Sequence, residues 1–295
     1  MNLVIGATGL LGSEICRQLI KKGKPLKAFV RKTSDQSKTD ALKSQGVELV
    51  YGDLKDTSSL QAACQGATHV ISTASSMLSR QEGDSIQTVD LEGQLHLIDA
   101  AKAAGVQQFV FISFVKDPAL SFPLSDAKFK VEEHLKASGM EYTILEANFF
   151  MEVWLSPALG FDYNNASARI YGDGQSKISW VSFVDVAKFA VAMLGSSEAR
   201  NNVFEIGGPE AVSPLEVVEI FEEISKKSFT TEHVAEETLQ VQKENAADPL
   251  QESFTGLMLD YASGKPMDMT QILQIYPLSL LSMRDYARNV MADSQ

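Results

Sequence analysis

Three glycines near the N-terminus have the type and spacing that can hold a phosphate group. Gly6, Gly9 and Gly12 form a G-x-x-G-x-x-G pattern between the apolar run Leu3–Ile5 and a helical pattern. Glycines at such a turn let the backbone approach a pyrophosphate, and the helix N-terminus offers unpaired N–H groups to it. Because the motif lies between a predicted strand and a predicted helix, it predicts a dinucleotide site. The residues of this loop are Gly6, Ala7, Thr8, Gly9, Leu10, Leu11 and Gly12.

The residues after the second predicted strand indicate which dinucleotide is bound. Arg31 and Lys32 follow the run Leu26–Val30, at the place where an NAD-specific unit carries an acidic residue for the ribose hydroxyls. A guanidinium cannot accept those hydrogen bonds, but its planar donors suit a ribose phosphate. We therefore predict NADP(H) rather than NAD(H), with a solvated basic loop as the alternative interpretation.

The elements around these residues predict a doubly wound α/β fold. Short apolar runs alternate with helical patterns up to about residue 150, which is typical of a parallel sheet covered on both faces. The predicted strands are Leu3–Ile5, Leu26–Val30, Val47–Tyr51, His69–Ser72, Phe109–Ile112 and Tyr142–Leu145. We predict a Rossmann domain over residues 1–150 and a smaller, closely packed α+β lobe for substrate or partner over 151–295. In that lobe, residues 168–171 and 177–181 flank a glycine turn and predict a hairpin.

Composition excludes several classes of function. The chain has 295 residues and a formal net charge of −12, which argues against a nucleic-acid backbone as partner. Its apolar runs are far shorter than the roughly 20 residues of a membrane span, and its start lacks the pattern of a secretory signal. Its two cysteines and four histidines form no cluster with metal-ligand spacing. We expect a cytoplasmic protein without a membrane span or a metal site.

Several segments resemble the NmrA-like group of atypical short-chain dehydrogenases/reductases. These segments are GATGLLG at 6–12, FVRK at 29–32, GDLKD at 52–56 and three longer stretches at 103–113, 128–145 and 181–194. The group includes isoflavone-reductase-like enzymes, quinone reductases and cofactor-sensing regulators. The resemblance implies an NAD(P)-binding Rossmann domain followed by a small substrate lobe.

The resemblance also implies further cofactor contacts. Asp53 and Leu54 follow the third predicted strand, where relatives hold the adenine through a carboxylate and a backbone N–H; a helix-capping aspartate is the alternative. Ser72, Thr73 and Ala74 end the fourth strand and are expected beside the adenosine ribose and the pyrophosphate.

The residues expected to react are matched only in part. Typical members carry a serine at the end of the fifth strand and Tyr-x-x-x-Lys on the next helix, and Ser113 and Lys128 match the serine and the lysine. The tyrosine position holds Leu124, which cannot pass a proton as a tuned phenol does. Ser113 and Lys128 are the candidate catalytic residues and are also expected to contact the cofactor, with a turn cap at the strand end and a surface lysine as the alternatives.

A second departure follows the sixth predicted strand. Relatives often show Arg-Pro where this chain has Glu146 and Ala147. Ala147 and Asn148 are expected near the nicotinamide carboxamide, although a turn is an equal interpretation for Asn148. The apolar residues Phe149, Phe150 and Trp154, together with Leu124, are candidates to line a pocket for an aromatic acceptor, or else belong to the core.

Two functions follow from the loss of the tyrosine. In the first, the protein is an NADPH-dependent reductase of a quinone or similar conjugated acceptor, whose reduced oxygen takes its proton from solvent. Lys128 then orients the nicotinamide ribose or acts itself as an acid or base. In the second, the protein binds NADP(H) without turnover, as a redox sensor, regulator or assembly factor with a protein partner.

Overall fold

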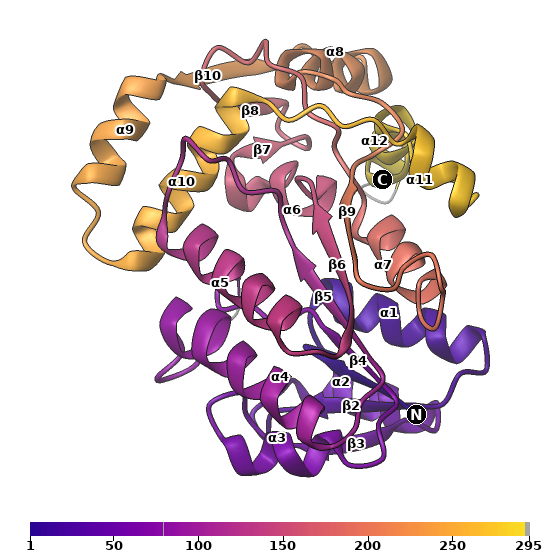
Figure 1. The fold of residues 1–295 in the computed structure, drawn as a ribbon. Helices are drawn as coiled ribbons and strands as arrows, with labels where there is room; N and C mark the ends of the chain where they lie inside the picture. The colour runs from indigo at the N-terminus through magenta and orange to yellow at the C-terminus, as the bar shows by residue number, and fades with distance from the viewer. Residues whose placement is uncertain (79, 293–295) are drawn as a thin grey trace. The chain divides into compact units, whose positions relative to one another are not determined.

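A central sheet organises the first part of the chain (Figure 1), which we describe from a computed structural model covering residues 1–78 and 80–292. Its strand order is β3-β2-β1-β4-β5-β6-β9, and the pairs joining β3 through β6 are all parallel. The strands are β1 (Asn2–Ile5), β2 (Leu26–Val30), β3 (Glu48–Tyr51), β4 (His69–Ser72), β5 (Gln108–Ser113), β6 (Glu141–Ala147) and β9 (Asn202–Ile206). The prediction of a doubly wound parallel sheet is confirmed, and each of the six predicted strands is present.

Helices cover both faces of this sheet. They are α1 (Leu10–Lys21), α2 (Gln36–Ser44), α3 (Thr57–Cys64), the π-helix η1 (Ile86–Gly93), α4 (Gln94–Ala103), α5 (Pro123–Ala137) and α7 (Phe183–Ala192). Figure 1 shows α3, α4 and α5 on one side of the sheet, and α1 and α7 on the other. This arrangement explains why every residue of β5 is buried, as expected of a strand covered on both faces.

The helical patterns of the sequence fold as their periodicity predicts. Helix α1 buries Leu11, Ile15 and Leu19 along one face, the i, i+4, i+8 spacing of an amphipathic helix. It is followed by Gly23, whose φ of 63° is a left-handed conformation that glycine adopts at low cost.

The described chain divides into two compact units. Unit 1 contains residues 1–114, 123–146 and 186–204, and unit 2 contains residues 115–122, 147–185 and the chain from 205 onward. Unit 1 therefore holds the carboxyl edge of β1 to β5, where the glycine loop and Ser113 lie.

Unit 2 has a small mixed sheet of its own, in the order β10-β8-β7. Strand β8 (Ser167–Tyr171) pairs antiparallel with β7 (Phe161–Asp162) and parallel with β10 (Thr230–Val234). The predicted hairpin is wrong, because β10 and β7 take both edges of β8. After the glycine turn, Ile178 instead forms isolated bridges to Val212 and Lys265.

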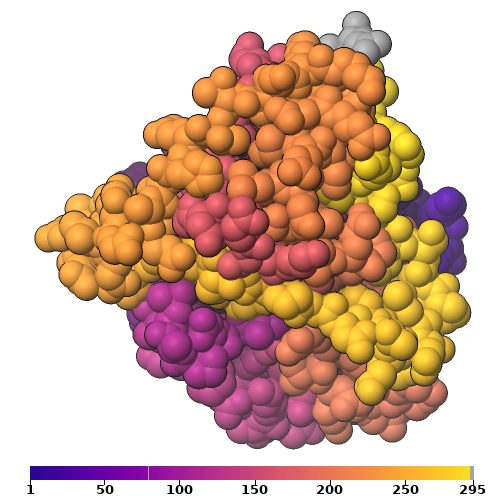
Figure 2. Space-filling view, turned by 90° about the horizontal axis from the view of Figure 1, so that it is seen from above, coloured from indigo at the N-terminus to yellow at the C-terminus, as the bar shows by residue number. Residues whose placement is uncertain are grey.

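The rest of unit 2 is helical. Its helices are α6 (Met151–Trp154), the 3₁₀-helix η2 (Pro157–Leu159), α8 (Pro214–Ser225), α9 (Glu236–Glu244), α10 (Pro249–Ser263), α11 (Thr270–Ile275) and α12 (Met283–Ala292). Helix α9 buries only Leu239, and the segment around it projects from the rest of this unit on the left of Figure 2. Ser213 begins α8 with a capping box to Glu216. Over the described residues, no helix is both long and apolar enough to cross a bilayer.

Candidate cofactor and active site

The glycine loop between β1 and α1 has no room for a side chain at two of its glycines. A Cβ on Gly12 would lie 2.1 Å from the carbonyl oxygen of Gly6, and a Cβ on Gly6 would lie 2.6 Å from Oγ1 of Thr73. Gly6 also has a φ of 81°, the left-handed region that disfavours any other residue. The loop therefore needs glycine at both positions, and it leaves a backbone-lined cradle of the kind that a pyrophosphate requires.

The first turn of α1 faces this cradle without a side-chain cap. Its N-cap residue is Gly9, which provides no capping side chain, so the first N–H groups of the helix are available to a ligand. Lys38, from α2, reaches the same loop and donates from Nζ to the carbonyl oxygen of Thr8 at 3.0 Å. Sequence reasoning missed Lys38, although its position in the helix after Arg31 and Lys32 was a signal that could have found it.

The end of β4 lies directly against the glycine loop. Thr73 donates from its backbone N–H and from Oγ1 to the carbonyl oxygen of Ile5, at 3.1 and 3.0 Å. Ser72 is fully buried and donates from Oγ to Gln94 at 2.7 Å. Gln94 in turn donates to the carbonyl oxygen of Ala74 at 3.1 Å. The hydroxyl of Ser72 is thus committed to holding the backbone of this segment.

Arg31 is paired with an acidic residue that sequence reasoning missed. Its Nη1 lies 2.5 Å from Oδ2 of Asp84, whose other carboxylate oxygen is paired with Nζ of Lys55. Burial alone would raise the pKa of Asp84, but hydrogen bonds from Lys55, the backbone of Gln81 and Arg31 lower it below its usual value. No local pattern links Arg31 to Asp84, because 53 residues separate them along the chain.

Asp53 and Leu54 lie in the loop after β3. Oδ1 of Asp53 accepts from the backbone N–H of Lys55 at 2.9 Å, and its Oδ2 lies 3.6 Å from the Lys55 ammonium. The capping role considered for Asp53 belongs instead to Asp56, whose side chain accepts from the backbone of Ser58 at the start of α3. Leu54 is buried.

Ser113 and Lys128 lie together around the end of β5. Lys128 is buried and donates from Nζ to the carbonyl oxygen of Ile112 at 2.8 Å, with the ring of Phe111 4.7 Å from the same atom. The surface-lysine alternative is therefore wrong. Ser113 donates from Oγ to Oε1 of Glu132 at 2.5 Å, so its hydroxyl is oriented by a carboxyl group on the same helix as Lys128.

Burial shifts both ionisable groups of this cluster. The pKa of Lys128 is lowered by burial, although the negative charges of Asp90 and Glu132 act in the opposite direction. The pKa of Glu132 is raised by burial, against the hydrogen bond from Ser113 and the charges of Lys136 and Lys128. Each shift favours the neutral form, which is how buried sites bring proton donors and acceptors closer to neutral pH.

Asp90 is a further buried acid that sequence reasoning missed. It lies on η1, and its Oδ2 accepts from the backbone N–H and Oγ of Ser76 at 3.0 and 2.6 Å. Its other oxygen, Oδ1, is buried without a hydrogen-bond partner among the described residues, and the same is true of Oγ of Ser125, one turn before Lys128. A π-helix, which is uncommon and concentrated at functional sites, was not predicted from the sequence.

Leu124 stands where the tyrosine is expected, in the first turn of α5. Its side chain is 4% exposed, so the position is apolar and shielded from water. Substitution of the phenol by Leu124 thus removes the proton donor without placing another titratable group at that position.

The residues predicted after β6 belong to unit 2 and are engaged within it. Asn148 donates from Nδ2 to the carbonyl oxygen of Lys265 at 2.7 Å, and Oδ1 accepts from the backbone of Phe149 at 2.9 Å. The ring of Phe149 makes an edge contact with Trp154 at 4.9 Å. Phe150 forms an isolated bridge with Val181, and Ala147 is buried at the end of β6. A nicotinamide or acceptor role for these residues remains a prediction.

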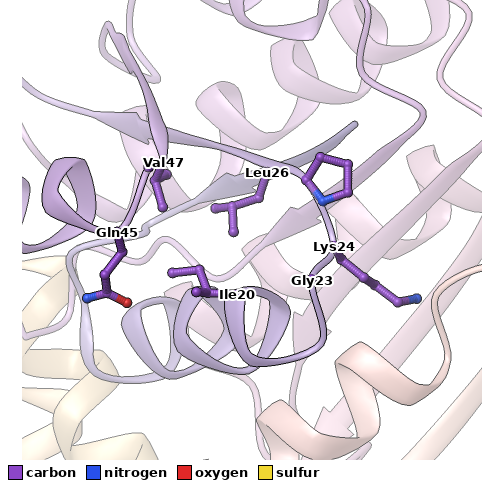
Figure 3. A pocket seen from close by; sticks show the side chains of 8 residues that line it. Ile20, Gly23, Lys24, Leu26, Gln45 and Val47 are labelled. Atoms are coloured by element: carbon purple, nitrogen blue, oxygen red, sulfur yellow. The ribbon is translucent and has the colours of Figure 1, made fainter.

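A shallow hollow on unit 1 lies at the opposite edge of its sheet from the glycine loop (Figure 3). It is lined by Ile20, Gly23, Lys24, Pro25, Leu26, Gln45, Gly46 and Val47. These residues precede β2 and β3, so the hollow is at the amino edge of the sheet. The glycine loop and Ser113 follow β1 and β5, at the opposite edge, which is where open α/β sheets bind their ligands.

Comparison with known proteins agrees with this geometry. The model of the NmrA-like family matches residues 2–278. The photosystem II assembly factor Ycf39 of Trieres chinensis is 32% identical over 231 residues, covering 77% of this chain and 69% of that protein. An NAD(P)H azoreductase of Xenophilus azovorans is 32% identical over 219 residues, covering 74% and 71%. A solved Escherichia coli NADPH-dependent quinone oxidoreductase in complex with NADPH matches with a TM-score of 0.78 at 21% identity, covering 99% of this chain and all of that one.

Proposed function

The chain belongs to the NmrA-like family, and from this premise we propose that it is an NADPH-dependent reductase that transfers hydride to a quinone or a similar conjugated acceptor. The observation that carries this proposal is the buried Lys128, held at the carboxyl end of β5 by the carbonyl oxygen of Ile112. A lysine without a function would stay on the solvent-exposed face of the helix, because burial of a charged group is costly. The azoreductase and the quinone oxidoreductase among the similar proteins support the same class of reaction.

The residues at the carboxyl edge of unit 1 fit NADP(H). The loop has no room for a Cβ at Gly6 or at Gly12, and the uncapped start of α1 suits a pyrophosphate. Arg31 and Lys55 already hold an anionic group, so their position suits the phosphate that distinguishes NADPH from NADH. When bound, NADPH supplies the hydride.

The remaining residues of the site restrict the acceptor. Leu124 provides no proton, so an alcohol–ketone interconversion that needs a phenol is disfavoured. A quinone oxygen can take its proton from water after reduction. Lys128 orients the nicotinamide ribose, and its lowered pKa also suits proton transfer.

Turnover with a panel of small quinones tests this proposal. We expect the wild-type protein to oxidise NADPH with at least one quinone, and Lys128→Met to lower kcat by roughly a hundredfold, the scale of a lost acid–base group. Lys130→Met is the matched control, because Lys130 is exposed on the same helix, and it should leave kcat unchanged. Wild-type protein that binds NADPH but never oxidises it would contradict the proposal.

A second function is favoured by Leu124 and by the similarity to Ycf39. In it, the protein binds NADP(H) without turnover and acts as a redox sensor, regulator or assembly factor. A buried leucine at the tyrosine position keeps a shielded site while removing its proton donor, which suits binding better than catalysis. Affinities that differ between NADP⁺ and NADPH, together with no quinone reduction, would favour this function over the reductase.

A further inference from the structure

We propose that Asp84 is a selectivity residue that competes with the 2′-phosphate of NADPH for Arg31 and Lys55. The inference rests on the NADPH-binding part of the proposed function and goes beyond it, because it assigns a role to an acidic side chain within the same site. Asp84 lowers the preference for NADPH over NADH, since only the phosphorylated cofactor has to displace it.

The pairing of Asp84 uses both of its carboxylate oxygens. Oδ2 lies 2.5 Å from Nη1 of Arg31 and accepts from the backbone N–H of Gln81 at 2.9 Å. Oδ1 is paired with Nζ of Lys55. Two cations and one N–H around a single anionic group resemble the donor set that binds a phosphate.

The exposure of the partners shows which groups a ligand can reach. The side chain of Asp84 is 1% exposed, whereas those of Arg31 and Lys55 are 26% and 28% exposed. The two cations therefore retain surface for a second anion, but their strongest donors are already engaged. A phosphate carries more negative charge than a carboxylate near neutral pH, so it can replace Asp84 as the partner of both cations. Because the two ion pairs of Asp84 must break first, the net binding free energy of the phosphate is reduced.

The charges around the pair agree with this role. Lys55 also lies 3.6 Å from Asp53, so two carboxylates share one ammonium. A phosphate placed there meets the repulsion of Asp84 and Asp53 unless Asp84 moves away. Gln81, whose backbone N–H binds Asp84, also contacts the loop after β2: its Oε1 accepts from Oγ1 of Thr33 at 2.5 Å.

The test compares two nucleotides that differ only in the 2′-phosphate. Calorimetric titration with 2′,5′-ADP and with 5′-AMP isolates the contribution of the 2′-phosphate to binding without any turnover. We expect Asp84→Asn to bind 2′,5′-ADP about tenfold more tightly than wild type, on the scale of one hydrogen bond to a charged group. The affinity for 5′-AMP should stay the same, and Arg31→Ala in the Asp84→Asn background should remove the gain.

A matched control separates this effect from net charge. Asp99→Asn makes the same change of charge on unit 1, at an exposed residue paired with His134, and should leave both affinities unchanged. Asp84→Ser replaces Asp84→Asn if the latter does not fold, as judged by circular dichroism.

Each remaining outcome has a definite meaning. If Asp84→Asn weakens binding of 2′,5′-ADP, Asp84 positions Arg31 for the phosphate, and competition is overturned. If Asp84→Asn binds 2′,5′-ADP with unchanged affinity, Asp84 only stabilises the local structure, and competition is also overturned. If neither wild type nor Asp84→Asn prefers 2′,5′-ADP to 5′-AMP, the NADPH part of the proposed function fails, and this inference fails with it.

Discussion

Two ends of the same sheet edge in unit 1 are built in different ways. The phosphate end, around Gly6, Gly12 and Arg31, uses backbone shape and partly exposed cations. The reaction end, around Ser113 and Lys128, uses buried side chains that hold one another. Under the proposed function, the difference predicts that binding a dinucleotide and using it depend on separate residues, whose substitution should affect the two properties independently.

The two ends also tolerate change differently. At the phosphate end, a backbone cradle requires glycine, and its donors are backbone N–H groups that most side-chain substitutions leave in place. At the reaction end, replacement of a single tyrosine by Leu124 removes a proton donor outright. Under the proposed function, loss of this proton donor therefore leaves the cofactor site in place.

The largest effect that we expect breaks the phosphate end alone. Gly12→Ala places a Cβ 2.1 Å from the carbonyl oxygen of Gly6, and because this neighbour is backbone, no rotamer change relieves the overlap. We expect NADPH affinity to fall by roughly a hundredfold or more, measured by titration alongside the melting temperature. Gly23→Ala is the control: its Cβ would meet nothing within 4 Å, and its φ of 63° strains any other residue, so it should lower the melting temperature but leave NADPH affinity unchanged. Unchanged affinity in Gly12→Ala would show that the cradle is not the pyrophosphate site.

A smaller effect separates the cofactors within the phosphate end. Arg31→Ala should weaken NADPH binding by about tenfold to a hundredfold, the scale of lost charge-assisted hydrogen bonds, with little change for NADH. Parallel titrations with both cofactors measure this ratio. Arg200→Ala, which removes an exposed pair with Glu141, should change neither value. Equal losses for NADPH and NADH would mean that Arg31 does not contact the phosphate.

The smallest effect concerns stability at the reaction end. Because burial raises the pKa of Glu132, the folded state keeps this proton to a higher pH than the unfolded state does. The resulting stabilisation is present at low pH and is lost as pH rises through the folded-state pKa. The glutamine of Glu132→Gln does not titrate, so the variant does not share this loss. The difference in free energy of unfolding, variant minus wild type, should therefore increase from pH 5 to pH 8.

Urea denaturation across that range measures this change. Glu133→Gln, at an exposed neighbour paired with Lys136, should follow wild type at every pH. If the free energies of unfolding of Glu132→Gln and wild type change with pH in the same way, the pKa of Glu132 is not raised in the folded state. Its carboxyl group would then be solvated in spite of its buried position.

Sequence patterns predicted much of this fold because the relevant signals are local. The six strands before residue 150 and the capping box at Ser213 follow from apolar runs and from residues three positions apart. The predicted hairpin after Gly172 failed for the opposite reason. Strand β8 pairs instead with β10, about 60 residues further along the chain, and no periodicity of either strand specifies that partner.

By itself, the sequence determined that a strand, a glycine turn and a helix follow one another, and that Leu124 replaces a tyrosine four residues before Lys128. These are statements about neighbours along the chain, where backbone sterics and helical spacing act directly. Only the tertiary structure decided that Lys128 is buried beside Ile112, that Glu132 holds Ser113, and that Asp84 meets Arg31 from 53 residues away. Burial and charge pairing depend on which segments the sheet brings together, and that depends on the packing of the whole chain.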